Sequence, residues 1–453
     1  MLKPYQKYKE TPALWLNNIP DHWESHKIRE LFVERSEKVS DKDYPPLSVS
    51  KAGVVPQIAT VAKTNDGDNR KLVRIGDFVI NSRSDRRGSS GISNYNGSVS
   101  LINIVLKPRS FVNGRYMHYL LKSHYFIEEF YRNGRGIVAD LWTTRYTEMK
   151  SIYLPVPNIE EQDQIVRFLD WKLAKINKLI QAKKKQVALL NEQKQVIINN
   201  AVTKGLDPNV PMKDSGIEWI GTIPEHWKVL YLSQTATEQS ISNKDIHNQN
   251  LLSLSYGKII NKDINTTDGL LPASFDTYQI VHNGNIILRL TDLQNDHKSL
   301  RVGLATQTGI ITSAYTCLLP RENVIPEFLY LLLHSYDICK VFYGMGGGVR
   351  QSIGFDDIRR LLIPVPPLEE QRQIVDFCYA KSNFIEGFLV GIEKEILLLT
   401  EYRTCLISDV VTGKVDVRGI EIPEYEAVPD DVTEDELDGE NAMDDEAEEA
   451  EVE

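Results

Sequence analysis

One stretch of this chain occurs twice, and the repeat constrains the fold more than any other feature. LPVPNIEEQDQIVRFLD begins at Leu154 and IPVPPLEEQRQIVDFCY begins at Ile363, with ten of seventeen positions identical. The two stretches start 209 residues apart. Repetition at a fixed spacing is typical of a chain built from copies of one structural unit, so we expect two copies here.

Two further pairs of segments surround this repeat. WLNNIPDHWE begins at Trp15 and returns as WIGTIPEHWK at Trp219. AVTKGLD at Ala201 returns as VVTGKVD at Val410, again 209 residues later. Between these anchors the copies diverge, with faint echoes such as GDFVINSR and GNIILRLT. Each half therefore has a similar entrance, a divergent middle and a similar exit.

The exit of each half predicts a long helix. Asn158 can cap the first, with Glu161 three residues later, whereas Pro367 in the second copy suits a first helical turn. Apolar residues then recur at alternating steps of four and three, the 3.5-residue period of a coiled-coil seam. The predicted seam consists of Leu169, Leu173, Ile176, Ile180, Val187, Leu190 and Ile197 in the first copy and Ile385, Leu389, Ile392, Ile396, Leu399 and Leu406 in the second.

The charges of the two helices favour their pairing. Residues 158–204 carry nine basic and five acidic side chains, and residues 367–414 carry five basic and eight acidic. Opposite charges favour packing of one helix on the other, and an antiparallel pair would be a rod of roughly 48 Å with a domain at each end. The alternative is that each helix docks only on its own domain.

The divergent middles mix strand-like runs with short helical ones, which predicts compact α/β domains. The predicted fold class is mixed α/β: two α/β domains joined by two long helices in an antiparallel coiled coil, with a pseudo-twofold internal repeat. The predicted boundaries are 1–157 for domain 1, 158–204 for the first spacer helix, 205–366 for domain 2, 367–416 for the second spacer helix and 417–453 for an acidic disordered tail.

Composition agrees with a protein of the reducing cytoplasm. Four scattered cysteines suit neither a disulfide framework nor a CxxC metal site, and we see no signal peptide or transmembrane run. The formal net charge of −11 comes from the C-terminus, because residues 421–453 hold seventeen acidic residues and no basic one. Residues 1–420 hold 52 basic and 46 acidic residues, a net charge of +6.

The catalytic motifs that we sought are missing. The sequence has no phosphate-binding P-loop, no nucleophile elbow, no dinucleotide fingerprint after a strand and no Asn-Pro-Pro-aromatic motif of an amino methyltransferase. His22 and His226 repeat, but each lies between Pro and Trp in the entrance, where packing is the better interpretation. We therefore predict a non-catalytic protein without a metal site.

Basic loops with glycine and aromatic residues stand out in the divergent middles. Arginine forks match guanine edges, and Asn or Gln matches adenine, so such loops suit DNA recognition. A solvated surface loop is the simpler alternative for any single arginine. The candidate DNA-binding residues are Arg83, Arg86, Arg87, Arg132, Arg135, Arg145 and Tyr146 in the first copy and Arg289, Gln294, Asn295, His297, Lys298, Arg301, Arg350 and Gln351 in the second.

The W-[IL]-x-x-IP-[DE]-HW entrance, the PVP-xx-EEQ-x-QIV exit and the VTKGLD ending resemble the specificity subunits of type I restriction–modification systems. The resemblance covers residues 1 to about 416. It implies that each middle is a target-recognition domain, which reads one half of an asymmetric bipartite sequence in double-stranded DNA, and that the helices set the spacing.

The resemblance also implies partners. Two modification subunits, which bind S-adenosylmethionine, would dock on the helices, and two restriction subunits would use ATP and magnesium; no cofactor is expected in this chain. Two other functions stay open: a coiled-coil assembly protein with two protein-binding heads, and a self-sufficient nuclease or methyltransferase.

Overall fold

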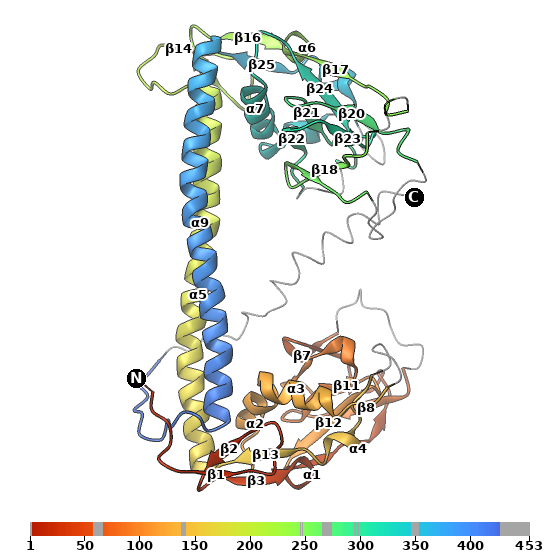
Figure 1. Ribbon diagram of the computed structural model, residues 1–453, viewed down its shortest axis with the longest axis vertical. Helices are drawn as coiled ribbons and strands as arrows, with labels where there is room; N and C mark the ends of the chain where they lie inside the picture. The colour runs from red at the N-terminus through yellow and green to blue at the C-terminus, as the bar shows by residue number, and fades with distance from the viewer. Residues whose placement is uncertain are drawn as a thin grey trace. The chain divides into compact units, whose positions relative to one another are not determined.

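The computed structural model of the chain describes residues 2–57, 67–136, 142–244, 246, 248–264, 274–293, 296, 299–345 and 353–425. These residues form two compact units. Unit 1 holds residues 2–185 and 393–425, and unit 2 holds residues 186–392. Each unit contains one divergent middle and a part of both long helices (Figure 1).

The two long helices are α5, Ile159–Lys204, and α9, Leu368–Val411. In unit 1 the pairing is antiparallel, because Gln164 of α5 bonds to the carbonyl of Val417, beyond the end of α9, whereas Lys183 pairs with Glu395 at 2.5 Å. In unit 2, Lys194 of α5 pairs with Glu386 of α9 at 3.0 Å. The sequence predicts this antiparallel coiled coil.

Burial along both helices follows the predicted seam. Leu169, Leu173, Ile176 and Ile180 of α5 are buried, and Val187, Leu190 and Ile197 are partly buried. On α9, Ile385, Leu389, Ile392, Ile396 and Leu406 are buried, and Leu399 is partly buried. Lys183 and Lys194 keep about a quarter of their side-chain surface exposed, because their ammonium groups reach out to glutamates of the facing helix.

The ends of both helices follow from local residues. The side chain of Asn158 caps α5 by accepting the Glu161 N–H at 2.9 Å. The sequence predicts Pro367 in the first turn of the second helix, but the residue stands directly before α9. Gly413 takes a left-handed φ of 77° and ends α9 at Val411, short of the predicted boundary at residue 416.

The divergent middle of unit 1 is built on a four-stranded antiparallel sheet in the order β10-β9-β12-β4. Smaller sheets pair β11-β8-β5, β6-β7, β13-β3 and β1-β2. The strands are β1 Tyr8–Glu10, β2 Asn18–Pro20, β3 Glu24–Lys27, β4 Phe32–Glu34, β5 Lys38–Val39, β6 Leu47–Ser50, β7 Gly53–Pro56, β8 Arg70–Val73, β9 Phe78–Asn81, β10 Ser90–Ile92, β11 Gly97–Val99, β12 Asn103–Pro108 and β13 Tyr153–Val156. The helices are α1 Ile28–Leu31, α2 Gly114–Leu121, α3 His124–Arg132 and α4 Tyr146–Met149, with a 3-10 turn η1 at Ser84–Arg86.

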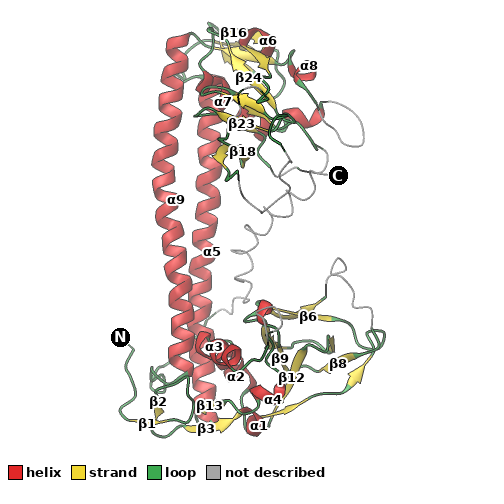
Figure 2. Cartoon of the chain, turned by 45° about the vertical axis from the view of Figure 1, so that its right-hand side comes forward, coloured by secondary structure: helices red, strands yellow, loops and turns green. Residues whose placement is uncertain are grey.

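The middle of unit 2 repeats this plan (Figure 2) with the sheet β22-β21-β24-β17 and the pairs β20-β23, β18-β19, β16-β25 and β14-β15. The strands are β14 Met212–Asp214, β15 Thr222–Pro224, β16 Lys228–Tyr231, β17 Ala236–Gln239, β18 Leu252–Ser255, β19 Lys258–Asn261, β20 Gln279–Val281, β21 Ile286–Leu288, β22 Val302–Leu304, β23 Gly309–Ile311, β24 Thr316–Pro320 and β25 Leu362–Val365. The helices are α6 Leu232–Thr235, α7 Pro326–Ile338 and α8 Phe355–Ile358, with a 3-10 turn η3 at Val341–Gly344.

Equivalent strands supply equivalent core residues in the two middles. One cluster in unit 1 joins Val73 of β8, Val79 of β9 and Val105 of β12. The matching cluster in unit 2 joins Val281 of β20, Ile287 of β21 and Cys317 of β24. The two middles therefore share one fold, although their sequences hardly match.

The helix ends also pack on the domains. In unit 2, one apolar core cluster contains Ile198 and Val202 near the end of α5 and Ile374 and Cys378 near the start of α9. The end of α5 thus packs on the domain of the second copy, and the start of α9 packs on its own domain. The alternative that each helix docks only on its own domain is therefore wrong.

Residues 417–425 correct the prediction of a tail that starts at 417. Val417 is fully buried, and the side chain of Gln164 in α5 donates to the carbonyls of Val417 and Ile420. Lys3 forms a β-bridge with Asp416, so the N-terminal segment meets the segment that follows α9 in unit 1. Residues 426–453 lie outside the described part.

Candidate nucleic-acid interface

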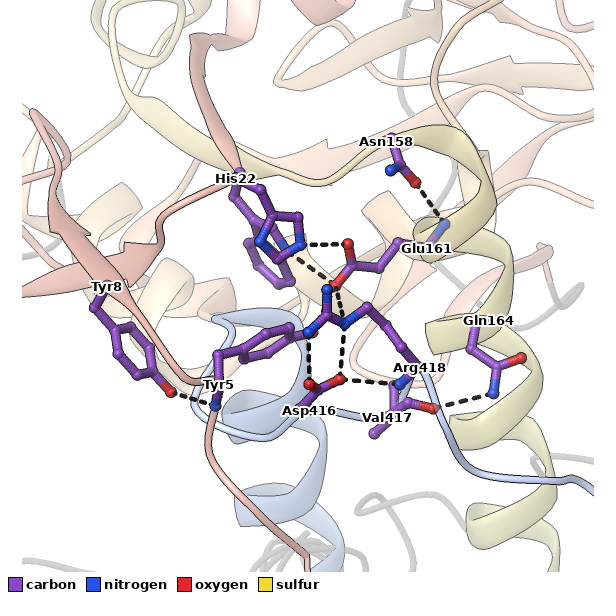
Figure 3. Close-up of polar contacts among 10 residues, drawn as sticks. Tyr5, Tyr8, His22, Asn158, Glu161, Gln164, Asp416, Val417 and Arg418 are labelled. Atoms are coloured by element: carbon purple, nitrogen blue, oxygen red, sulfur yellow. Dashed lines mark hydrogen bonds and ion pairs between the residues drawn. The ribbon is translucent and has the colours of Figure 1, made fainter.

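In unit 1 the entrance and exit motifs meet at Glu161, the second acid of the repeated EEQ (Figure 3). Its buried carboxylate accepts hydrogen bonds from His22 Nε2 at 2.8 Å, Trp23 Nε1 at 3.1 Å and the Tyr5 hydroxyl at 2.7 Å. Burial raises the pKa of Tyr5, and the bond to Glu161 adds to the rise, so the phenol stays a donor. Arg418, which is paired with Asp416, lies 3.9 Å from the same carboxylate.

Unit 2 contains the same joint with fewer partners. Glu370 accepts hydrogen bonds from His226 Nε2 at 2.7 Å and from Trp227 Nε1 at 3.0 Å. No tyrosine or arginine side chain joins it among the described residues of this unit. His22 and His226 are therefore packing residues in this structure, which agrees with the interpretation from sequence.

The glutamine of each EEQ makes a second repeated contact. Gln162 accepts the N–H of Asn113, at the start of α2, and donates to the carbonyl of Pro157. Gln371 accepts the N–H of Ile325, at the start of α7, and donates to the carbonyl of Pro366. The repeated motif thus fixes each domain to its long helix through the same contacts. The variable loops lie elsewhere in the domain and can differ between the copies.

Two variable loops of unit 1 lie against each other. The first follows β9 and contains η1, and the second precedes α4. The N–H of Thr144 donates to the carbonyl of Ser82 at 2.9 Å, and the N–H of Ser84 donates to the carbonyl of Trp142 at 3.1 Å. The two loops therefore form one composite surface, which we call the loop face of unit 1.

Unit 2 ties its corresponding loops by the same bond. Ile353, two residues before α8, donates its N–H to the carbonyl of Leu290 at 3.0 Å. In the faint echo GDFVINSR and GNIILRLT, Leu290 is the counterpart of Ser82, and Ile353 stands before α8 as Thr144 stands before α4. Both domains therefore present a loop face from the same two places in the fold. In unit 1, Arg83, Arg86, Arg87 and Arg145 lie in these loops.

The arginines on the loop face of unit 1 fall into two groups. Arg83, Arg86 and Arg145 are exposed, and their side chains have no hydrogen-bond or ion-pair partner among the described residues. Arg87 pairs with Glu128 and lies 4.6 Å from the Tyr131 ring centroid. The first three can reach a ligand as they stand, whereas Arg87 is held by the protein.

Three other candidates in unit 1 also have protein partners or shelter. Arg132 forms a bidentate pair with Glu129 on its own helix, with both distances 2.8 Å. Arg135 lies 3.9 Å from Glu148 but remains largely exposed. Burial raises the pKa of Tyr146, so this partly buried phenol stays neutral and can both donate and accept a hydrogen bond.

A small pocket opens between the two loops of unit 1. Its lining is mainly apolar and aromatic and includes Phe130, Tyr131 and Trp142 together with Arg83 and Arg87. An apolar surface beside cationic forks suits the edge and methyl groups of bases better than a phosphate, which needs only charge.

The structure corrects the candidate Arg301 in unit 2. This residue is fully buried, and its guanidinium donates to the carbonyls of Thr291, Asp292 and Asp296 and to the hydroxyl of Tyr343. It holds the loop between β21 and β22 together and cannot reach DNA in this conformation.

The remaining candidates of unit 2 are less informative. Arg289, at the start of the same loop, is partly buried and interacts with other residues of the protein. Six candidates lie outside the described residues: Gln294, Asn295, His297, Lys298, Arg350 and Gln351.

One surface escaped the sequence reasoning, which followed only the seam. Phe384 and Phe388 of α9 are 65% and 53% exposed, and their rings stack edge to face at 4.9 Å. In unit 2, Leu189 and Val196 of α5 are similarly exposed. With Leu389 at position a of the heptad, all four occupy c or g positions, which line one face of an antiparallel pair. The 3.5-residue period of the seam also fixes the c and g positions, so it could have predicted this apolar face.

The described residues lack both a membrane-spanning helix and a metal-binding cluster. No described helix is both long and apolar enough to span a membrane. No cluster of three or more histidine, cysteine, aspartate or glutamate side chains suited to a metal ion occurs in the described ranges.

Comparison with known proteins decides the family. The sequence model of the "Type I restriction modification DNA specificity domain" matches residues 20–189 and 239–393. The chain belongs to this family. The two matches correspond to the two copies of the repeat, so the chain is a DNA-specificity subunit that does not itself carry catalytic chemistry.

Individual relatives agree with the family. The chain is 23% identical over 449 residues to the putative type I restriction enzyme MjaX specificity subunit of Methanocaldococcus jannaschii, covering 91% of this chain and 97% of the relative. It is 25% identical over 287 residues to the MjaVIII specificity subunit of the same organism, covering 60% of this chain and 64% of that subunit.

A solved structure shares the fold. It comes from work on complex assembly and conformational transition of the type I R-M system and matches with a TM-score of 0.63 at 12% sequence identity. The match covers 88% of this chain and 99% of that chain.

Proposed function

We propose that each loop face reads one half of an asymmetric, bipartite target in double-stranded DNA. The paired helices α5 and α9 set the spacing between the half-sites and dock the modification subunits. In this proposal two modification subunits bring S-adenosylmethionine, and two restriction subunits bring ATP and magnesium, to an assembly that works in the cytoplasm.

The observation that carries this proposal is the hydrogen bond that ties the two variable loops of each domain. Thr144 to Ser82 in unit 1 and Ile353 to Leu290 in unit 2 join the same places in the fold. The side chains on the two loop faces nevertheless differ. A constant frame with variable loops suits recognition of two different sequences, and hence of an asymmetric target.

Docking of modification subunits is supported by the exposed apolar residues on the helices. In unit 2 these are Phe384, Phe388, Leu189 and Val196, which together form the apolar face described above. A second row of apolar c and g positions offers an apolar surface to helices of another subunit, which would extend the coiled coil into a bundle.

The experiment uses the full chain purified together with its modification subunits. Binding to random duplex DNA should be weak and should fall steeply with salt, and selection should enrich a bipartite sequence. Exchange of residues 20–157 for those of a relative should change one half of that sequence and leave the other unchanged. Partner binding without any DNA preference would contradict the proposal and favour a coiled-coil assembly protein.

A further inference from the structure

We propose that Arg83 is a specificity-determining residue of the first recognition domain and that it reads a guanine in the half-site bound by unit 1. This inference rests on the proposed function and assigns a role to one side chain.

The backbone of Arg83 is held from several sides. Its N–H donates to the Asn81 side chain at 3.0 Å, and it forms an antiparallel β-bridge with Thr143 of the second loop. The residues on either side complete the connection, because the Ser82 carbonyl and the Ser84 N–H bond to the second loop. A reader whose backbone is already ordered loses less entropy on binding than one on a loose loop.

The side chain of Arg83, in contrast, is exposed and has no hydrogen-bond or ion-pair partner among the described residues. It also lines the small pocket between the loops, beside Trp142. Its guanidinium is therefore free to donate two parallel N–H hydrogen bonds to one ligand. Arginine donating to O6 and N7 of guanine in the major groove is the commonest specific contact between a protein and a base.

The neighbouring arginines have different roles. Arg87 is already engaged with Glu128 and Tyr131, so it shapes the loop face and is a positioning residue. Arg86 closes the 3-10 turn η1 and is exposed, but it makes no β-bridge to the described residues of the second loop. A charge on a turn without such anchoring suits a phosphate, whose contacts need little orientation.

Unit 2 has no arginine at the corresponding place. In the echo GDFVINSR and GNIILRLT, Arg83 corresponds to Thr291. The carbonyl of Thr291 accepts a hydrogen bond from the buried Arg301, so this loop is organised from within. We therefore assign guanine reading by this position to unit 1 alone.

The test compares the wild-type chain with Arg83→Ala, Arg83→Lys and Arg86→Ala, each purified with the modification subunits. Bound sequences are selected from a duplex library, and the exchange of residues 20–157 identifies the half-site of unit 1. We expect wild type to prefer guanine at one position of that half by about 10- to 100-fold, and Arg83→Ala to lose this preference at that position only.

The controls separate base reading from other roles. Arg83→Lys should keep a reduced preference, and Arg86→Ala should weaken binding to all sequences about equally. A uniform loss of affinity in Arg83→Ala, an unchanged preference, or a unit 1 half-site without guanine would overturn the assignment while leaving the proposed function intact. A wild-type complex that selects no sequence would instead refute the proposed function and this inference with it.

Discussion

Replacing the two repeated glutamates by alanine should have unequal effects, and the structure gives the size of the difference. In unit 1, Glu161→Ala removes the acceptor of Tyr5, Trp23 and His22. Tyr5 and Trp23 are buried, with 4% and 0% of their surface exposed, so both donors would be left without a partner. The His22 side chain is 39% exposed and can bond to water instead.

In unit 2, Glu370→Ala leaves one buried donor, Trp227, because the side chain of His226 is 46% exposed. A buried donor without a partner costs about 1–3 kcal/mol. Loss of Glu161 should therefore destabilise unit 1 by about 2–6 kcal/mol, and loss of Glu370 should destabilise unit 2 by about 1–3 kcal/mol.

Hydrogen exchange measured by mass spectrometry suits this comparison, because the two units need not unfold together and exchange reports local opening. In Glu161→Ala, protection should fall most in residues 3–8 and 412–420, which meet at this carboxylate. Glu370→Ala should leave those segments unchanged, and Glu160→Ala, at the exposed neighbour, should change neither unit. Equal losses of protection in the two alanine variants would refute the reasoning.

Three further predictions concern other parts of the chain. Burial, with a contribution from Lys194, lowers the pKa of His334 to about 4. The free energy of unfolding should therefore fall as the pH drops from 6.5 toward 4, by up to about 1.4 kcal/mol per pH unit. In urea unfolding, the free energy of unfolding of His334→Phe should depend less on pH between 6.5 and 5 than that of the wild type. Arg301→Met should lower the free energy of unfolding of unit 2 by about 3–5 kcal/mol, because it removes the donor to several buried carbonyls. Arg83→Met should change the free energy of unfolding of unit 1 by less than about 0.5 kcal/mol. Equal effects would contradict the structural role of Arg301. Phe384→Ser with Phe388→Ser should weaken binding of the modification subunit by at least about tenfold in calorimetry without lowering stability, and unchanged affinity would place the docking surface elsewhere.

The long helices and the repeat could be predicted because their signals are local and periodic. The seam residues follow the 3.5-residue period, and burial along α5 and α9 has the same pattern. The meeting of the IPxHW and EEQ motifs at Glu161 was not predictable in detail, because residues about 138 positions apart in the chain supply it. Repetition of both motifs was the available signal.

The candidate site shows where sequence reasoning fails. Arg83 and Arg301 both lie in basic loops that follow equivalent strands, and nothing in the local sequence distinguishes them. Arg301 is buried because the longer loop between β21 and β22 turns its carbonyls inward onto the guanidinium. Such a network depends on the tertiary path of the loop, which neither composition nor spacing encodes.

The end of α9 was misplaced for a simpler reason. The exit AVTKGLD has its glycine at Gly205, whereas VVTGKVD has it one position earlier, at Gly413. Both glycines take a φ of 77°, so the second helix ends earlier than the repeat alone suggests. The swap of Lys and Gly between the two copies was visible in the sequence and could have set the boundary.

Adenine-methylation mapping of the host genome, with and without this gene, tests the central claim most directly. If the two loop faces address a modification complex, a bipartite, asymmetric methylated motif will be present in the wild type and will vanish on deletion. An unchanged set of methylated motifs in cells that express active modification subunits would contradict the account.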